Sequence, residues 1–313
     1  MNPLEIKNTG GYKSPPDERD LKLEVVASAS MPETLPESCF IDVSKLPVWY
    51  QRQIGACVGH AWGKSQQNCE FVETGKVINL SARFLYAMAK CKDNYSGEGT
   101  YPRLVASILK DYGCATEDTV PNDTTLPHEE YVYNRKQENI PVKAFQEAPK
   151  YGIAGYAWPT QDEDGLKRAI FYAKTKRQGV VLLMRVGNTY WTAPDGTVTW
   201  DKNKILPIQR PKDITSGHEI YPIGYEYKEG RLVIYFLNSW SDMWADNGKG
   251  WFYYDEHKDL IDEVMTSIDK EDVPAKVFNK NLSFGMTDPD VLILQKFLNS
   301  HGFPVATSGA GSP

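Results

Sequence analysis

The most regular pattern along the chain is an apolar stripe at helical spacing between residues 56 and 73. Small or apolar side chains recur there at steps of three, four and seven residues; they are Val58, Ala61, Trp62, Ser65, Cys69 and Val72. The stripe predicts a helix with Cys57 in its first turn. A second amphipathic stretch begins near Ser81, the expected cap, and a third covers residues 104–112 before the stop signal Gly113.

Beyond about residue 151 the pattern changes to short runs of β-branched and aromatic residues between turn residues, which are typical of strands. These runs cover residues 179–186, 197–200, 219–225, 232–237 and 250–254. A helical part followed by a sheet-rich part predicts an α+β fold. We expect the functional site in the cleft between the two parts.

The two ends of the chain differ from this central region. Residues 1–38 are rich in Pro, Glu, Ser and Asp, so we expect an arm or a short leader without a regular core element. Residues 276–313 form a C-terminal tail with a Gly- and Ser-rich end. The main domain is therefore predicted over residues 39–275, with a helical lobe at about 50–150 and a sheet lobe at about 151–260.

Composition and charge indicate the size of the core, the partners that the protein does not favour and its compartment. The chain has 313 residues, 41% of them hydrophobic, which is enough for a full core. Its formal charge of −6, from 35 basic and 41 acidic residues without long runs, favours neither a nucleic acid nor a membrane surface as partner. The chain shows neither a secretory signal nor a span of about 20 apolar residues, so the sequence predicts a cytoplasmic protein.

The five cysteines do not indicate a disulfide scaffold, because their number is odd and they are sparse. If one of them stays free for chemistry, the other four are best interpreted as small residues that are buried or half-buried. These four are Cys39, Cys69, Cys91 and Cys114.

The fifth, Cys57, lies in the segment QRQIGACVGHAW, which begins at Gln51. This segment resembles the nucleophile segment of papain-like cysteine peptidases, in which a glutamine lies six residues before the cysteine. A thiol at a helix N-terminus faces the positive end of the helix dipole, which favours the thiolate and lowers its pKa below about 8.5. The backbone N–H of Cys57 and the side-chain amide of Gln51 are then expected to stabilise an oxyanion.

The second half of the resemblance is Gly217-His218-Glu219, followed by Asn238-Ser239-Trp240. In the family, the histidine acts as general base and acid, and the asparagine orients its ring and fixes its tautomer. The resemblance implies these roles for His218 and Asn238, with Trp240 shielding their hydrogen bond. It implies no metal and no cofactor. The interval between Cys57 and His218 is long for the family, and an insertion around residues 191–213 accounts for it.

The resemblance runs from about residue 35 to 254 and predicts a two-lobe papain-like fold, with a helical N-terminal lobe and an antiparallel, barrel-like C-terminal lobe. The residues that it implies for binding a polypeptide substrate are Gly99, Thr100, Tyr101, Gly217, Glu219 and Trp240. The chain departs from the family pattern at Val58, at Ser241 in place of a glycine, and at Ile54 in place of a disulfide cysteine. The last exchange agrees with a reducing compartment.

Two other functions stay open beside a cysteine endopeptidase. One is a catalytically silent papain-like binding or structural module. The other is a peptidase directed to cell-wall peptides, because residues 284–299 resemble the first helix of small peptidoglycan-binding-like domains. In that case the tail would contact peptidoglycan. A packed or solvent-facing His60 is a simpler interpretation than a metal ligand, because no second Cys/His pair lies at ligand spacing.

Glu219 follows the histidine at a position where the family mostly has a small apolar residue. One alternative is that its side chain turns into solvent or pairs with a surface lysine, since strand neighbours alternate between faces. The other is that it lines the pocket for the side chain two residues before the cleaved bond. A carboxylate there would attract Arg or Lys substrates.

Overall fold

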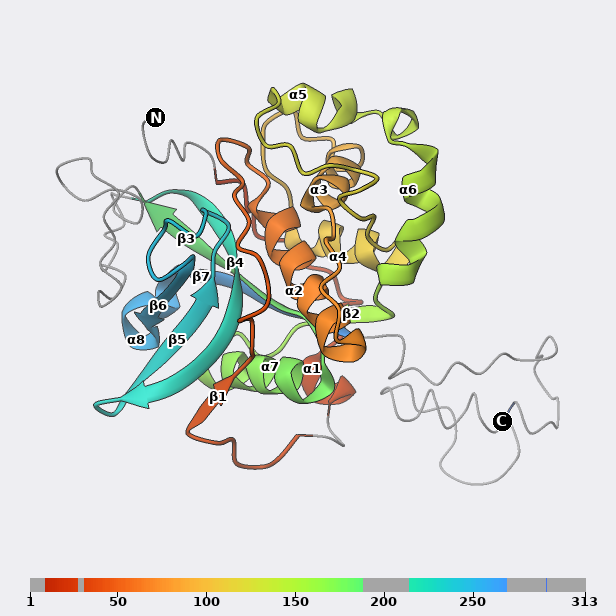
Figure 1. The fold of residues 1–313 in the computed structure, drawn as a ribbon. Coiled ribbons are helices and arrows are strands. Elements are labelled where there is room, and N and C mark those ends of the chain that lie inside the picture. The colour runs from red at the N-terminus through yellow and green to blue at the C-terminus, as the bar shows by residue number, and fades with distance from the viewer. Residues whose placement is uncertain (1–8, 28–30, 188–213, 269–290, 292–313) are drawn as a thin grey trace.

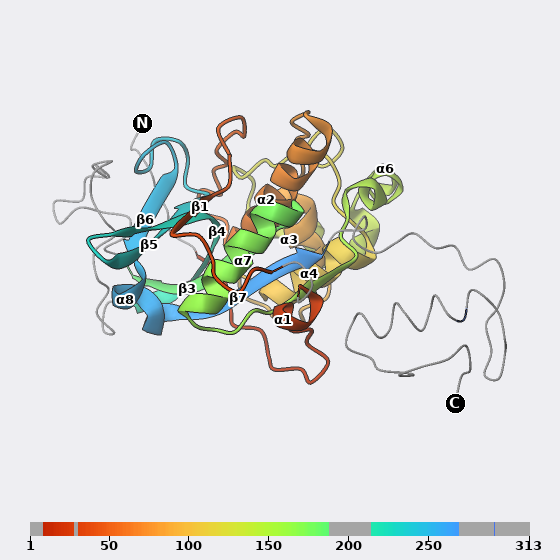
Figure 2. The same ribbon diagram turned by 90° about the horizontal axis from the view of Figure 1, so that it is seen from below.

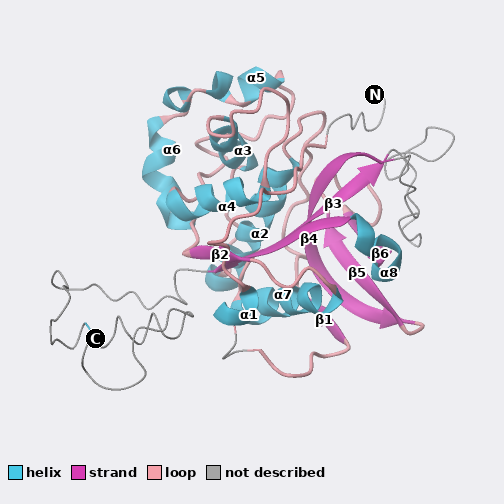
Figure 3. Ribbon diagram, turned by 180° about the vertical axis from the view of Figure 1, so that it is seen from behind, coloured by secondary structure: helices cyan, strands magenta, loops and turns pink. Residues whose placement is uncertain are grey.

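Helix α2 (Cys57–Thr74) runs through the middle of the molecule and separates a helical lobe from a sheet lobe (Figure 1). The computed structural model describes residues 9–27, 31–187, 214–268 and 291. Figure 3 shows the separation by type: α3 to α6 gather on one side, and β3 to β6 lie on the other. The predicted α+β plan of two lobes is confirmed.

The helical lobe contains the three helices that the sequence predicted, within about two residues at either end. Its elements are α2, α3 (Ala82–Lys90), α4 (Pro102–Asp111), α5 (His128–Tyr131) and α6 (Val142–Glu147), with 3₁₀ turns at Tyr133–Arg135, Gln137–Asn139 and Ala148–Tyr151. Ser81 caps α3, because its side chain accepts a hydrogen bond from the N–H of Phe84 at 3.0 Å. Gly113 follows α4 at φ 82°, where a side chain would overlap the carbonyl oxygen of Ala148.

The sheet lobe is antiparallel throughout its described strands. They are β1 (Ser38–Phe40), β2 (Gly155–Ala157), β3 (Val180–Gly187), β4 (Ile214–Lys228), β5 (Arg231–Leu237), β6 (Lys249–Tyr253) and β7 (Ile261–Ile268). Their order is β2-β7-β3-β4-β5-β6, with β1 paired to β4. The first half of β4 pairs with β3 and its second half with β5 and β1, so this long strand joins two parts of the lobe.

Four of the five predicted strands correspond to β3, β4, β5 and β6. The fifth, residues 197–200, lies outside the described residues, as does the proposed insertion at 191–213. Helices α7 (Glu163–Lys176) and α8 (Tyr254–His257), the turn at Lys258–Leu260 and strands β2 and β7 were not predicted. The expectation that residues 1–38 form no core element is wrong at one point, because α1 (Leu23–Val26) buries Leu23 in the core of the sheet lobe, whereas β1 only begins at Ser38, the last of these residues.

Each lobe has its own hydrophobic core. One core lies between the sheet and α7, which packs on β1, β4 and β7 (Figure 2), and the other surrounds α2, α3 and α4. Polar contacts join the lobes along α2. Asn68 Nδ2 donates to the hydroxyl of Tyr221 at 2.9 Å, and Ser65 Oγ accepts from the N–H of Val180 at 2.9 Å. None of the helices in the described part is long and apolar enough to cross a bilayer.

Candidate active site

The thiol of Cys57 lies at the first turn of α2, where the sequence placed it, and is fully buried between the lobes. The backbone N–H groups of Val58 and Glu219 are directed at its sulfur. A third N–H, from Gly10, lies 3.4 Å from Sγ. Because the first N–H groups of a helix lack partners within the helix, this end of α2 is suited to hold a negative charge.

His218 lies in β4 and Asn238 directly after β5, and the pairing of these strands brings the two side chains together. Nε2 of His218 lies 2.8 Å from Oδ1 of Asn238, which also accepts the N–H of Ser239 at 2.8 Å. Because Oδ1 accepts, Nε2 carries the proton, and Nδ1 keeps its lone pair. Within the described ranges, Nδ1 has no hydrogen-bond partner. The ring of Trp240 stacks on His218 with centroids 4.4 Å apart.

Gln51 is held beside this pair by both ends of its amide. Nε2 donates to the carbonyl of Ile54 at 3.0 Å, and Oε1 accepts from Ser239 Oγ at 2.5 Å. Its backbone N–H also donates to the carbonyl of Ser239 at 2.9 Å. These contacts fasten the loop before Cys57 to the segment that carries Asn238.

The N-terminal arm, residues 9–14, crosses this site. Gly11 donates its N–H to the carbonyl of Gly217 at 3.0 Å, and Thr100 donates to the carbonyl of Gly10 at 2.8 Å. Tyr12 donates to the carbonyl of Thr100 at 3.1 Å. The arm runs parallel to the segment around Thr100 and presents an N–H, not a carbonyl carbon, to the sulfur of Cys57.

The arm therefore contacts the segments that the sequence predicted to bind substrate. Besides Thr100 and Gly217, it meets Gly99, whose backbone touches Gly10, and Tyr101, whose ring lies 6.1 Å from that of Tyr12. This contact was not predicted, because Thr9-Gly10-Gly11 has no hydrophobic pattern of its own. Two adjacent glycines are nevertheless a signal that a backbone passes close to something.

Burial under the arm determines the protonation states of Cys57 and His218. It raises the pKa of the Cys57 thiol to about 12, despite the N–H groups that surround the sulfur. Burial also lowers the pKa of His218 to about 4, against the hydrogen bond to Asn238. Both shifts favour the neutral thiol and the neutral imidazole. The expected lowering of the Cys57 pKa by the helix terminus is thus wrong for this arm-covered state, since desolvation outweighs it.

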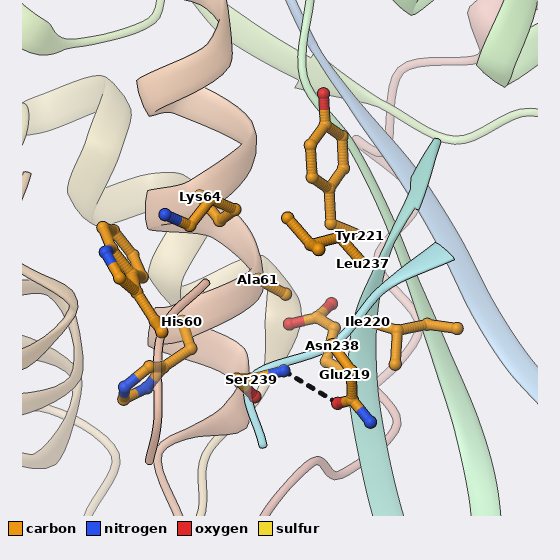
Figure 4. A pocket seen from close by; sticks show the side chains of 10 residues that line it. His60, Ala61, Lys64, Glu219, Ile220, Tyr221, Leu237, Asn238 and Ser239 are labelled. Atoms are coloured by element: carbon orange, nitrogen blue, oxygen red, sulfur yellow. Dashed lines mark hydrogen bonds between the residues drawn. The ribbon is translucent and has the colours of Figure 1, made fainter. Parts of the chain in front are cut away.

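The solvent-facing alternative for Glu219 is wrong in this structure, because only 1% of the residue is exposed. Its side chain lines a small cavity of about 10 Å³ between α2 and the sheet, opposite Ala61 and Lys64 (Figure 4). Neither carboxylate oxygen has a partner among the residues described. Burial raises the pKa of Glu219 well above its usual value, and repulsion from Glu263 adds to this.

This buried acid predicts a dependence of stability on pH. The folded state holds the proton of Glu219 more tightly than the unfolded chain does, so its contribution to stability is lost as pH rises above the unfolded pKa of about 4.3. Glutamine cannot ionise. We therefore expect Glu219→Gln to have a higher free energy of unfolding than the wild type at pH 8, with the gap closing towards pH 4.

Urea unfolding at several pH values measures this difference. The exposed Glu37 provides the control, because Glu37→Gln removes one carboxylate from the surface and leaves the buried Glu219 in place. A Glu219→Gln profile that runs parallel to that of the wild type would contradict a neutral buried acid.

Most of the remaining candidates are buried. The four other cysteines are free thiols, buried except for the half-buried Cys91. His60 is packed: its Nδ1 lies 2.8 Å from the carbonyl of Ala56.

Ser241, where the family pattern has glycine, adopts a left-handed conformation at φ 74°, which is strained for serine. In the described part of the chain, no group of three His, Cys, Asp or Glu side chains is arranged to hold a metal ion.

Several solved structures resemble this fold. Xylellain, a cysteine protease from Xylella fastidiosa, is 18% identical with a TM-score of 0.68, over 86% of this chain and 98% of that one. Digestive procathepsin L 3 of Tenebrio molitor is 18% identical with a TM-score of 0.54, over 80% and 74%. Carica candamarcensis protease CMS1MS2 is 16% identical with a TM-score of 0.54, over 75% and 99%.

A comparison with curated protein sequences gives no match. The sequence model of one family, described as papain family cysteine protease, matches residues 41–271. That match covers the two lobes and every candidate residue from Gln51 to Trp240. Because it spans more than half of the chain, the protein belongs to the papain family of cysteine proteases.

Proposed function

We propose that the protein hydrolyses peptide bonds within polypeptides, with Cys57 as nucleophile and His218 as general base and acid. The observation that supports this most is the His218–Asn238 hydrogen bond of 2.8 Å, which leaves Nδ1 of the ring with its lone pair and with no partner among the described residues. Stacked Trp240 shields this bond from water. Asn238 thereby orients the ring for proton transfer.

The reaction follows from these positions. Nδ1 of His218 takes the proton of the Cys57 thiol, the thiolate attacks the carbonyl carbon, and the oxyanion is stabilised by the N–H of Cys57 and the amide of Gln51. The His218 imidazolium gives its proton to the leaving amine as the C–N bond breaks, which leaves a thioester. His218 then removes a proton from a water molecule that attacks the thioester, the C–S bond breaks, and the thiol is restored.

Cleavage of a peptide library, followed by mass spectrometry of the products, tests this function. The wild type should cut internal peptide bonds, and the Cys57→Ala protein should cut none. A catalytically silent papain-like module would give the same uncut library with both proteins.

Gln51 gives a further prediction. If its amide is an oxyanion donor, Gln51→Ala should lower kcat by about 10²-fold to 10³-fold with a smaller change in KM. Ser239→Ala serves as a matched control, because it removes the contact to Gln51 Oε1 and keeps the donor. Equal losses in the two variants would mean that Gln51 only fastens the loop.

Contact with peptidoglycan is not part of this proposal. The family match ends at residue 271, before the tail at 276–313, and residues 284–299 lie outside the described residues apart from Val291. The idea stays a prediction from the sequence. A pull-down on purified peptidoglycan, with and without the tail, decides it.

A further inference from the structure

The peptide group between Gly99 and Thr100 is held from two opposite sides. On the side of the arm, Thr100 donates its N–H to the carbonyl of Gly10 at 2.8 Å and accepts the N–H of Tyr12 at 3.1 Å. On the other side, the carbonyl of Gly99 accepts a hydrogen bond from Nζ of Lys90 at 3.0 Å. Because a trans peptide group is planar, its C=O and N–H point in opposite directions. The contact with Lys90 therefore fixes the direction of the Thr100 N–H.

Lys90 is the last residue of α3, and its ammonium group is buried beneath the segment that leads to Gly99. Besides the Gly99 carbonyl, Nζ contacts the carbonyl of Tyr95 at 2.9 Å and Oδ2 of Asp93 at 2.7 Å. An ammonium group has three donors, and these three acceptors use all of them. The side chains of Lys90 and Asp93 are both fully buried. The ion pair therefore holds this cation in place under Gly99.

Tyr86 lies one turn before Lys90 on α3 and holds the other backbone group of Gly99. The N–H of Gly99 donates to the hydroxyl of Tyr86 at 2.8 Å. Residues four apart lie on the same face of a helix, so both contacts come from one face of α3. Gly99 itself has φ 92°, a conformation that favours glycine. Both backbone groups of Gly99 are thus bound by α3, and both of Thr100 are turned to the arm.

The charge of Lys90 also affects the strength of the next hydrogen bond. A cation on the carbonyl oxygen polarises the peptide group, and hydrogen bonds that follow one another in a chain strengthen each other. The N–H of Thr100 is therefore a better donor with Lys90 in place. The arm, which passes the sulfur of Cys57, pairs with Thr100 through its backbone alone. A substrate backbone that replaces the arm meets the same two groups of Thr100.

We propose that Lys90 is a positioning residue for substrate binding, which keeps the N–H of Thr100 directed at the bound chain, with Tyr86 in the same role for the preceding N–H. The inference rests on the proposed function. Lys90 acts on a contact with the substrate backbone and not on the reacting carbonyl. Its loss should weaken the ground state and the transition state equally, which raises KM and leaves kcat nearly unchanged.

The test uses the full-length Gly10→Ala chain, in which the new Cβ would overlap the carbonyl oxygen of Gly55 and displace the arm. Loss of Lys90 alone would leave a buried, unpaired carboxylate at Asp93, which is strongly destabilising. The test variant is therefore Lys90→Met with Asp93→Asn. The control is Asp93→Asn alone, which keeps the ammonium group on Gly99. We expect KM for a fluorogenic peptide to be about 10-fold higher in the double variant, as for one lost hydrogen bond, with kcat within about 2-fold.

Two tyrosines provide a second comparison without a change of charge. Tyr86→Phe removes the hydroxyl that accepts the N–H of Gly99 and should also raise KM. Tyr131→Phe is the matched control, because Tyr131 is equally buried and its hydroxyl donates to Asn122 at 2.6 Å and not to Gly99. Equal KM values in the two Phe variants would overturn the inference. So would a loss in the Lys90 double variant that lies in kcat and not in KM.

Alkylation of Cys57 by iodoacetamide judges the inference without peptide cleavage. In chains that keep Gly10, the arm pairs with Thr100, so the Lys90→Met, Asp93→Asn chain should hold it more loosely. We expect alkylation about 10-fold faster than in the Asp93→Asn chain, and equal rates would overturn the inference. If the Gly10→Ala chain has a reactive Cys57 but cuts no peptide, the proposed function fails. If it cuts peptides and KM does not depend on Lys90, only this inference fails.

Discussion

Replacement of Cys57 by alanine is expected to lower kcat/KM for a peptide substrate by about 10⁶-fold, the loss seen when a catalytic nucleophile is removed. His218→Ala should cost nearly as much, because the two groups act as a unit. Hydrolysis of a fluorogenic peptide under pseudo-first-order conditions measures both losses.

Cys69→Ala and Cys114→Ala are the matched controls. Both thiols are buried in the described structure, so these variants should lower the free energy of unfolding and leave turnover per folded molecule unchanged. Full activity in the Cys57→Ala protein would refute the assignment of the nucleophile. A large loss in Cys69→Ala or Cys114→Ala with the fold intact would refute their structural role.

Displacement of the arm should raise activity by about 10²-fold, the gain expected if the arm covers the site in about 99% of molecules. A single methyl group, added at Gly10, is expected to displace the arm. A Cβ at Gly10 would overlap the carbonyl oxygen of Gly55 and lie 2.5 Å from Cα of Gly99, and neither backbone can move aside cheaply. Gly10→Ala therefore removes the arm from the site without shortening the chain. The kcat/KM of the full-length variant measures the effect.

Gly11→Ala provides the comparison and should activate much less, because its Cβ would overlap only the flexible end of Leu183 and would lie at ordinary contact distance from the backbone of Gly217 and Glu219. The rate of alkylation by iodoacetamide against pH gives a second readout. With the arm displaced, water reaches the site, the burial that raises the pKa of Cys57 is relieved, and fast alkylation should begin at lower pH than in the wild type. Equal kcat/KM and equal pH profiles in Gly10→Ala and wild type would refute an inhibitory arm.

The sequence predicted those parts of the molecule whose local pattern agrees with their environment. The stripe that begins at Cys57 marked α2, and Ser81 marked the start of α3, because periodicity and capping are local. Strand β7 was missed for the opposite reason. It begins with Ile261, Asp262 and Glu263 and buries Thr266 and Ser267, so its composition is not that of an apolar strand.

The residues of the candidate site could be predicted from the sequence, but their contacts with the arm and their protonation states could not. The motifs around Cys57, His218 and Asn238 resemble a family, and the fold brings the last two to 2.8 Å. No local pattern could show that Gly10 reaches the thiol from 47 positions earlier in the chain, or that Glu263 meets the arm. Such contacts depend on the tertiary fold. For the same reason, the raised pKa of Cys57 could not be foreseen from its place at a helix terminus.

The most direct test of the central claim is covalent labelling of the full-length Gly10→Ala protein with a peptide-like epoxide, followed by mass spectrometry of its peptides. Only a thiol activated by an adjacent imidazole should react quickly with such a reagent. The account predicts a single adduct, on Cys57, which is lost in His218→Ala. Labelling of another cysteine instead, or equally fast labelling of Cys57 without His218, would contradict it.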